Sequence, residues 1–247
     1  MNYYVCLLDP TSGGVPETAQ HALESAPRSR GLPYHWQWLS GAAVMFVGSD
    51  VARFFNAVTR HGYWGLGSVR LDNRTDVERW TGANAGELSD ADLVVDAIAQ
   101  RGASCIPDLL GDFAFLAWHP RTLTGVMACD VFAVRKLYYT THLHLLAVSS
   151  RAEALALDNR YDQQYLAERV AACEPAPGST AFAGVKAVPA AGVVLLDENK
   201  LTTRRYWSVQ TFATAPLLPT DATEAAQECR RLLETSVRGR LTGRADT

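Results

Sequence analysis

The side chains best suited to chemistry in this chain are its five cysteines and six histidines. The cysteines are widely spaced, at Cys6, Cys105, Cys129, Cys173 and Cys229. No C-x-x-C pair or cysteine–histidine cluster occurs, so the spacing predicts neither a zinc site nor a disulfide framework. His142 and His144 alternate in an expected strand but lack the further ligands that a metal site needs. We therefore expect no bound metal, and free thiols in a reducing cytosol.

Cys6 is the thiol closest to the start of the sequence, and it lies in an apolar run that predicts a buried strand. A thiol in apolar surroundings stays protonated and behaves as a small hydrophobic residue. A nucleophile would need to be a thiolate, and Cys6 has no free amine beside it. We therefore interpret Cys6 as a core residue rather than as a nucleophile.

The size and charge of the chain exclude several classes of protein. With 247 residues, 48% of them hydrophobic and 20% charged, it can hold one large globular domain, or one domain and the start of a second. A net charge of −3 gives no electrostatic basis for binding nucleic acid or an anionic membrane. The first residues lack the basic segment of a signal peptide, and no apolar run is long enough to span a bilayer. We expect a cytoplasmic protein.

Apolar periodicity and turn residues predict strands and helices in an order typical of an α+β protein. Strands are expected at residues 1–10, 42–47, 67–71, 112–118, 124–129, 136–140, 143–149, 185–188, 192–197 and 204–207. Helices are expected at residues 51–61, 89–101, 161–172 and 221–240, and a loop at about 11–33. Ser89 is placed to cap its helix, with Asp90 and Asp92 in the first turn.

A break in composition at residues 211–220 predicts a linker between two domains. Residues 1–210 would form the first domain, and residues 221–247 would be the first helix of a second, truncated domain. Asp221 and Glu224 resemble a capping box at the start of that helix. An apolar stripe with helical spacing follows, formed by Ala225, Cys229, Leu232, Leu233 and Val237.

The most informative stretch of the chain begins at Gly111. It reads Gly111-Asp112-Phe113-Ala114-Phe115-Leu116-Ala117-Trp118 and is followed by Cys129-Asp130 and Leu137-Tyr138-Tyr139. This sequence resembles the G-D-F-A-F-x-x-W-D and A-R-D-x-x-G-x-x-x-L-Y-Y motifs of the glutaminase-like domain of asparagine synthetases and their relatives. This resemblance implies a four-layer αββα sandwich of two antiparallel sheets, as in N-terminal nucleophile hydrolases and class II glutamine amidotransferases.

Residues 69–74 resemble one branch of that family more than the others. Val69, Arg70 and Leu71, followed by Asp72, Asn73 and Arg74, match the V-R-L-D-N-R segment of lactam synthetases and lasso-peptide cyclases. Asparagine synthetases proper tend to have N-G-E-I-Y-N in that place. The resemblance therefore implies an enzyme that joins an amine and an acid already present in its substrate.

The nucleophile that the resemblance implies is missing. The family uses a cysteine directly after the initiator methionine, with its own α-amine as the base, and position 2 is Asn2. Asparagine has no thiol, and its bulk disfavours removal of Met1. Ser68 and Arg70 stand near the family's oxyanion-hole position, while Asp90 matches an ammonium-binding aspartate or simply stabilises its helix. We expect no catalytic residue, and we treat Asn2, Ser68, Arg70 and Asp90 as remnants of a glutamine pocket.

The second motif, at residues 129–139, also differs in sequence from the family motif. Cys129 replaces an arginine, Ala133 a glycine and Lys136 a proline. We interpret Asp130 as a structural turn residue rather than a catalytic one. The other motif residues to which we assign structural roles are Asp72, Asn73, Arg74, Gly111, Asp112, Phe113, Tyr138 and Tyr139.

The resemblance implies a glutaminase-inactive N-terminal domain of an ATP-dependent amide-forming ligase, most similar to lasso-peptide macrolactam synthetases. ATP and Mg²⁺ are expected on a synthetase domain, in cis or in trans, because this chain has no Gly-rich phosphate loop. The domain itself would be a scaffold, with a precursor peptide and a leader peptidase as expected partners. The alternative is a free-standing binding or regulatory protein that uses the former glutamine pocket, near Asp90, for a peptide or a protein partner.

Overall fold

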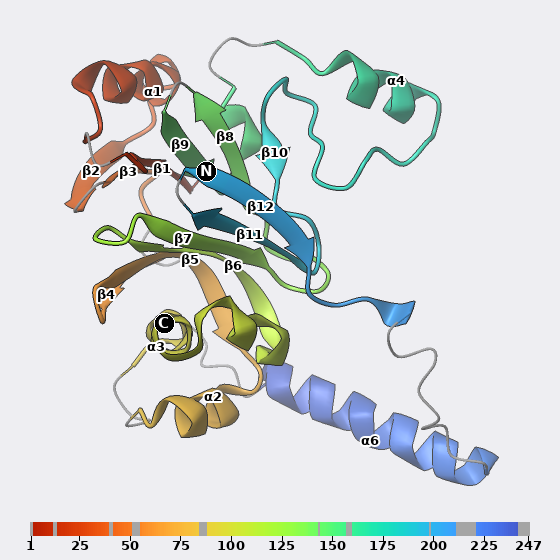
Figure 1. Cartoon of the computed structure of the whole chain (residues 1–247). Helices are drawn as coiled ribbons and strands as arrows, with labels where there is room; N and C mark the ends of the chain where they lie inside the picture. Colours follow the sequence, from red (N-terminus) through yellow and green to blue (C-terminus); the bar gives the residue numbers. More distant parts are fainter. Residues whose placement is uncertain are drawn as a thin grey trace.

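Two six-stranded antiparallel sheets packed face to face form the body of the protein (Figure 1). The computed structural model describes residues 2–11, 14–39, 42–50, 55–83, 88–142, 144–156, 160–197, 199–210 and 221–241. Sheet A contains, in spatial order, β10 (Lys186–Ala187), β8 (Tyr138–His142), β9 (Leu145–Ser149), β1 (Tyr3–Leu8), β3 (Ala42–Val47) and β2 (Tyr34–Leu39). Sheet B contains β12 (Lys200–Arg205), β11 (Gly192–Asp197), β7 (Thr124–Cys129), β6 (Gly111–His119), β5 (Tyr63–Leu71) and β4 (Asn56–Arg60).

Helices cover the outer face of each sheet and complete four layers (Figure 1). Leu23 of α1 packs on sheet A, and Leu93 and Ile98 of α3 pack on sheet B. The predicted four-layer arrangement of two antiparallel sheets between helices is therefore confirmed. The helices are α1 (Glu17–Ser29), α2 (Arg74–Thr81), α3 (Asp90–Arg101), α4 (Gln163–Val170) and α6 (Ala222–Leu241), with short 3-10 helices at Gly102–Asp108 and Ala152–Ala154.

Strand β1 separates two hydrophobic cores because successive side chains of a strand point to opposite faces. Tyr3 and its odd-numbered neighbours face α1, whereas Tyr4, Cys6 and Leu8 face sheet B. All six residues of β1 are buried. The strand pairs with β3 on one side and with β9 on the other, so its backbone groups also lie inside the sheet.

Strands β5 and β6 show the same alternation in sheet B. Leu66, Leu116 and Trp118 point between the sheets, while Phe113 and Phe115 point toward α3. The two faces therefore bury separate clusters, one between the sheets and one beneath the helices. This arrangement explains why the motif at residues 111–118 is apolar at nearly every position.

The start of α3 agrees with the sequence-based prediction. Ser89 accepts a hydrogen bond from the backbone N–H of Asp92, and the Asp92 carboxylate accepts one from the backbone N–H of Ser89. This reciprocal pair is a capping box, which satisfies two otherwise unpaired donors at the helix N-terminus. The Ser89 side chain thereby fixes where α3 begins.

Two predicted elements are wrong. The expected loop at about 11–33 contains α1, which starts after Pro16 and includes Pro27 near its C-terminal end. Proline at a helix start is well tolerated because the first N–H groups have no partner within the helix. The expected helix at 51–61 is contradicted by β4, an edge strand paired with β5, and residues 51–54 lie outside the described part.

Other predicted boundaries differ from those of the structure by a few residues, and some elements have no counterpart in the prediction. Strand β12 lies at Lys200–Arg205 rather than at 204–207, and β10 is shorter than the expected 185–188. The sequence patterns did not reveal β2 or α2. The predicted linker at 211–220 lies outside the described residues.

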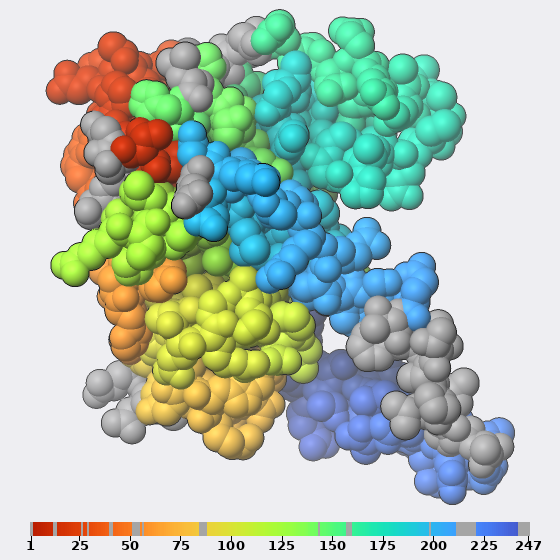
Figure 2. Space-filling model, viewed as in Figure 1, coloured from red at the N-terminus to blue at the C-terminus, as the bar shows by residue number. Residues whose placement is uncertain are grey.

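Helix α6 forms where the sequence predicts a helix, and it projects from the body (Figures 1 and 2). Its C-terminal turn is the part that contacts sheet B, through two hydrogen bonds of 2.7 and 2.8 Å from Arg240 to Asp112. The large apolar side chains of its stripe are more than half exposed: Leu232, Leu233 and Val237. Among the helices described, none is long and apolar enough to cross a bilayer.

Replacing Gly67 with alanine is expected to destabilise the protein. A Cβ atom at Gly67 would lie 2.3 Å from the carbonyl oxygen of Ala114 and 2.7 Å from the Cα of Phe115. Because both are backbone atoms, we expect Gly67→Ala to lower the free energy of unfolding by about 1–3 kcal/mol in urea titrations. Gly239→Ala is the control, since its nearest neighbour would be 3.7 Å away. Equal stability of Gly67→Ala and wild type would contradict this packing.

Candidate functional site

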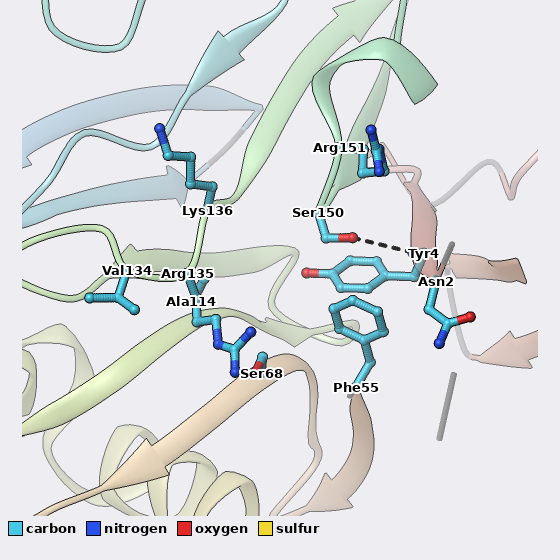
Figure 3. A pocket seen from close by; sticks show the side chains of 10 residues that line it. All are labelled: Asn2, Tyr4, Phe55, Ser68, Ala114, Val134, Arg135, Lys136, Ser150 and Arg151. Atoms are coloured by element: carbon cyan, nitrogen blue, oxygen red, sulfur yellow. Dashed lines mark hydrogen bonds between the residues drawn. The ribbon is translucent and has the colours of Figure 1, made fainter. Parts of the chain in front are cut away.

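A cavity of about 510 Å³ opens between the two sheets, where β1 begins and β5 nears its end (Figure 3). Its wall combines polar side chains, positive charges and two aromatic rings. The lining residues are Asn2, Tyr4, Phe55, Ser68, Ala114, Val134, Arg135, Lys136, Ser150 and Arg151. They come from strands of both sheets and from the loop between β7 and β8.

The cavity forms where the inward-facing positions of the strands change from apolar to polar. Along β5 the residues facing sheet A change from Leu66 in the core to Ser68 at the cavity. Along β1, read toward its start, Cys6 is in the core, Tyr4 borders the cavity and Asn2 lines its rim. Apolar side chains that would fill the space between the sheets are replaced there, so the sheets leave an opening.

Tyr4 brings a phenol into the cavity from the first strand. Its side chain is 1% exposed, and its ring packs edge to face on Phe55 with centroids 5.0 Å apart. Burial raises the pKa of the Tyr4 hydroxyl well above its usual value. The hydroxyl is therefore neutral at physiological pH and can donate a hydrogen bond.

Positive charge comes from Arg135, Lys136 and Arg151. Arg151 forms an ion pair with Glu153, with its Nε 2.7 Å from the carboxylate oxygen. In Figure 3 the guanidinium group of Arg135 points toward Ser68. Among the described residues, Arg135 and Lys136 have no ion pair with a carboxylate.

Asp130 holds the loop that carries Arg135 and Lys136. Its buried carboxylate accepts hydrogen bonds from the backbone N–H groups of Phe132 at 2.9 Å and Val134 at 3.1 Å, and more weakly from that of Arg135 at 3.4 Å. A further hydrogen bond of 3.2 Å comes from the N–H of Phe113 in β6. These contacts fit the structural role predicted for Asp130, because they hold the loop against the sheet.

The four predicted remnants of a glutamine pocket are not all in one place. Asn2 and Ser68 line the cavity, but Arg70 and Asp90 do not. Asp90 accepts a hydrogen bond from the backbone N–H of Leu71 at 2.8 Å and another from Arg74 at 2.6 Å. The cavity thus contains two of the four residues, Asn2 and Ser68, whereas the carboxylate of Asp90 joins α3 to β5.

Residues 70–74 form a polar network at the end of β5. Arg70 donates to Asp72 at 2.5 Å and to Asp112 at 3.1 Å. The side chain of Asn73 bonds the backbone just before β6: its Nδ2 donates to the Asp108 carbonyl at 2.9 Å, and its Oδ1 accepts from the N–H of Leu110 at 3.0 Å. Arg74 also pairs with Glu78 of α2 at 2.7 Å. These contacts connect β5, α2, α3 and β6.

The remaining motif residues lie in or beside the core. Gly111 has a φ of +146°, and a Cβ atom there would lie 2.0 Å from the Arg70 carbonyl oxygen, so glycine is required. Phe113 is 1% exposed and packs beneath α3. Tyr138 and Tyr139 point to opposite faces of sheet A, the first toward the α1 side and the second between the sheets.

Cys6 lies in the core between the sheets and is absent from the cavity lining. Burial raises its pKa far above that of an exposed thiol. The sequence-based interpretation of Cys6 as a core residue is thus supported by its position. Sequence reasoning did not identify Tyr4, Phe55, Arg135, Ser150 or Arg151 as cavity residues.

The fold and the cavity define a sandwich protein with an opening at the start of its first strand, and comparisons with known proteins assign it to a family. Residues 75–207 match the model of the glutamine amidotransferase domain, which is more than half of the chain. The chain therefore belongs to the glutamine amidotransferase domain family. The matched segment includes both motifs at residues 111–118 and 129–139.

The similarity to individual proteins is lower. Amidase chry2 of Gibberella zeae is 30% identical over 95 residues, covering 36% of this chain and 14% of that protein. A glutamine phosphoribosylpyrophosphate amidotransferase from B. subtilis, solved with ADP and GMP, has a TM-score of 0.48 at 14% identity and covers 83% of this chain and 49% of its own. A structure described as the allosteric regulatory enzyme of purine biosynthesis has a TM-score of 0.43, again at 14% identity, and covers 83% and 43%. The chain thus spans less than half of each relative, and we transfer no ligand or residue role from them.

The burial of three cysteines predicts a clear pattern of thiol reactivity. Burial raises the pKa of Cys105 to about 11 and that of Cys129 to about 12, and that of Cys6 further. At pH 8 these thiols are protonated and unreactive, whereas a free thiol of pKa about 8.5 is partly ionised. We expect iodoacetamide to label exposed Cys173 and Cys229 in the native protein, and all five cysteines in urea, as measured by peptide mass spectrometry. Labelling of native Cys6 at the rate of Cys173 would contradict the assignment.

Proposed function

We propose that the chain is a glutaminase-inactive amidotransferase domain of an ATP-dependent, amide-forming ligase of the asparagine-synthetase-like family. The observation that carries the proposal is the composition of the cavity at the start of β1. Asn2 lines it, and no cysteine is among the described residues that do. A domain of this family without a thiol at that place has no group to form a covalent intermediate with glutamine.

Other nucleophiles in the cavity are unsuited to replace a thiol. Ser68 and Ser150 contribute hydroxyl groups, but a serine needs an adjacent general base to become nucleophilic. Among the described residues that line the cavity there is neither a histidine nor a carboxylate to act as that base. The Ser150 hydroxyl accepts a 3.4 Å hydrogen bond from the N–H of Tyr4. The cavity therefore supports binding rather than hydrolysis.

ATP and magnesium, which such a ligase uses, do not fit the residues present here. No group of three or more histidine, cysteine or acidic side chains in the described part of the chain is placed to hold a metal ion. The sequence also contains no Gly-rich loop that would cradle phosphates. We therefore assign adenylation to a separate synthetase domain, joined in cis or bound in trans, and derive no step of it from this chain.

The sequence of residues 69–74 suggests the branch of the family to which the parent enzyme belongs. The V-R-L-D-N-R segment resembles lactam synthetases and lasso-peptide cyclases, which join an amine and an acid of one substrate and need no ammonia. A domain without a glutaminase nucleophile is consistent with such chemistry. We propose a lasso-peptide macrolactam synthetase as the parent enzyme, with a precursor peptide and a leader peptidase as partners.

Helix α6 supports the need for a partner. Its described residues include none that is buried, and Leu232, Leu233 and Val237 are exposed by 51%, 61% and 57%. Apolar side chains gathered on one helix face favour packing against another protein surface. In the ligase this surface would be the synthetase domain, for which the present domain is a scaffold. A free-standing regulatory protein is the alternative, and its partner would then bind in trans.

The proposal predicts no glutaminase activity. Purified chain incubated with glutamine is expected to release glutamate at the rate of the buffer alone, measured with a coupled dehydrogenase assay. Cys6→Ser is the matched control, since it removes the thiol of β1, the strand that lines the cavity through Tyr4, while keeping a small side chain. Glutamate release that is above background in the wild type and lost in Cys6→Ser would contradict the proposal.

The ligase assignment has its own check in the surrounding genome. Reading frames for a short precursor peptide and a transglutaminase-like peptidase are expected beside this gene if the parent makes lasso peptides. A neighbourhood restricted to asparagine metabolism would argue against that branch, while leaving the absence of glutaminase activity unaffected.

A further inference from the structure

We propose that the cavity between the sheets binds a small organic carboxylate without reacting with it. The guanidinium group of Arg135 and the hydroxyl groups of Tyr4 and Ser68 would hold the carboxylate, and Phe55 would contact its apolar part. The inference rests on the proposed function in one respect, the absence of a nucleophile from this cavity. It goes further in naming the class of ligand and the residues that select it.

The first observation is the sign of the charge around the cavity. The described part of its lining includes Arg135, Lys136 and Arg151 and no acidic residue. Glu153 already pairs with Arg151, whereas Arg135 and Lys136 have no carboxylate partner within the described residues. The carboxylate of Asp130 lies beneath their loop, but its oxygens accept from backbone N–H groups. A negatively charged ligand would therefore meet positive charge that no side chain neutralises.

The second observation is the phenol of Tyr4. The side chain is buried to 1% exposure and lines the cavity, and its hydroxyl has no hydrogen bond with any described residue. In Figure 3 that hydroxyl points into the space between β1 and the loop that carries Arg135. The hydroxyl opens into the cavity, so a ligand oxygen placed there can accept its hydrogen bond.

The positions of the hydrogen-bond donors favour a carboxylate over a cationic or uncharged ligand. Arg135 extends toward Ser68 across the floor of the cavity, while Tyr4 and Phe55 form the opposite side (Figure 3). A guanidinium group offers paired N–H donors that match the two oxygens of a carboxylate. The two serine hydroxyl groups and the neutral phenol add donors that need no charge of their own.

The size and apolar parts of the wall indicate an organic anion rather than an inorganic one. The cavity volume of about 510 Å³ lies within the range of small-molecule sites. Phe55, Ala114 and Val134 present apolar atoms to it. An inorganic phosphate ion would leave these surfaces in contact with water, whereas an aryl or alkyl carboxylate would cover them.

The loop with Arg135 is held in place before any ligand binds. The carboxylate of Asp130 accepts hydrogen bonds from the N–H groups of Phe132 and Val134 in this loop. Asp130 directly follows the last residue of β7, so the sheet fixes the position of its backbone. Pre-positioned donors lose less entropy on binding than mobile ones. The backbone around Arg135 is thus already ordered for recognition.

Isothermal titration calorimetry with phenylacetate tests the proposal. Phenylacetamide, which has nearly the same shape without the charge, and inorganic phosphate are the comparison ligands. We expect phenylacetate to bind with a dissociation constant of about 1 mM or lower, as suits so small a ligand. Phenylacetamide and phosphate are each expected to bind about tenfold more weakly or not detectably, and binding of phenylacetate is expected to weaken as salt is added.

Variants assign the contacts. Arg135→Gln is expected to weaken phenylacetate about tenfold or more, Arg135→Lys less, and Tyr4→Phe by a few-fold, since charged hydrogen bonds contribute more than neutral ones. Arg79→Gln is the control, because exposed Arg79 lies on α2 away from the cavity. Arg135 is exposed, so its replacement leaves the core intact, and an unchanged circular dichroism melting curve checks this.

Three outcomes would overturn the proposal: no binding of phenylacetate, equal binding of phenylacetamide, or unchanged binding by Arg135→Gln. Binding of phosphate alone would show an inorganic anion site and would also reject an organic carboxylate. None of these results concerns glutamine hydrolysis, so the carboxylate site and the glutaminase-inactive assignment can fail separately.

Discussion

The burial of β1 on both faces and along both edges is the constraint on which the structure of the site depends. The strand pairs with β3 and β9, and its side chains alternate between the α1 core and the core between the sheets. Cys6 is therefore locked into the inter-sheet core, where burial keeps its thiol protonated. A side chain here could reach a ligand as a nucleophile only where the chain leaves the core, just before β1, and that position is occupied by Asn2.

The same packing sets the character of the cavity. Because β1 and β5 both change from apolar to polar residues at one end, the sheets separate there and leave room for a ligand. The loop held by Asp130 then adds Arg135 and Lys136 to the rim. An amidotransferase fold has thus kept its opening while its wall carries cations, hydroxyl groups and an amide instead of a thiol. We propose ligand recognition without covalent chemistry as the function of this wall.

Local sequence signals predicted the parts of the fold that depend on neighbouring residues. The capping box at Ser89, the strand at residues 42–47 and the structural position of Asp130 all follow from short-range patterns. Helix α1 is not evident from the sequence because Pro16 and Pro27 are typical of loops, although Pro16 stands at the N-cap position and Pro27 lies near the end of the helix. The apolar spacing of β4 fits both a helix and a strand, and only its pairing with β5 decides between them. The family resemblance indicated two residues of the cavity, Asn2 and Ser68. The rest of its lining could not be predicted from local patterns, because sheet packing brings together residues as far apart as Tyr4 and Arg151.

We propose that the described wall of this amidotransferase cavity contains no activated nucleophile. Intact-protein mass spectrometry after incubation with a diazoketone analogue of glutamine, which alkylates a glutaminase nucleophile irreversibly, tests this. We expect an unchanged mass after hours of incubation, with a glutaminase that has its cysteine as the positive control. A stoichiometric adduct mapped to residues 2–8 would contradict it, because it would place a reactive group at the start of β1.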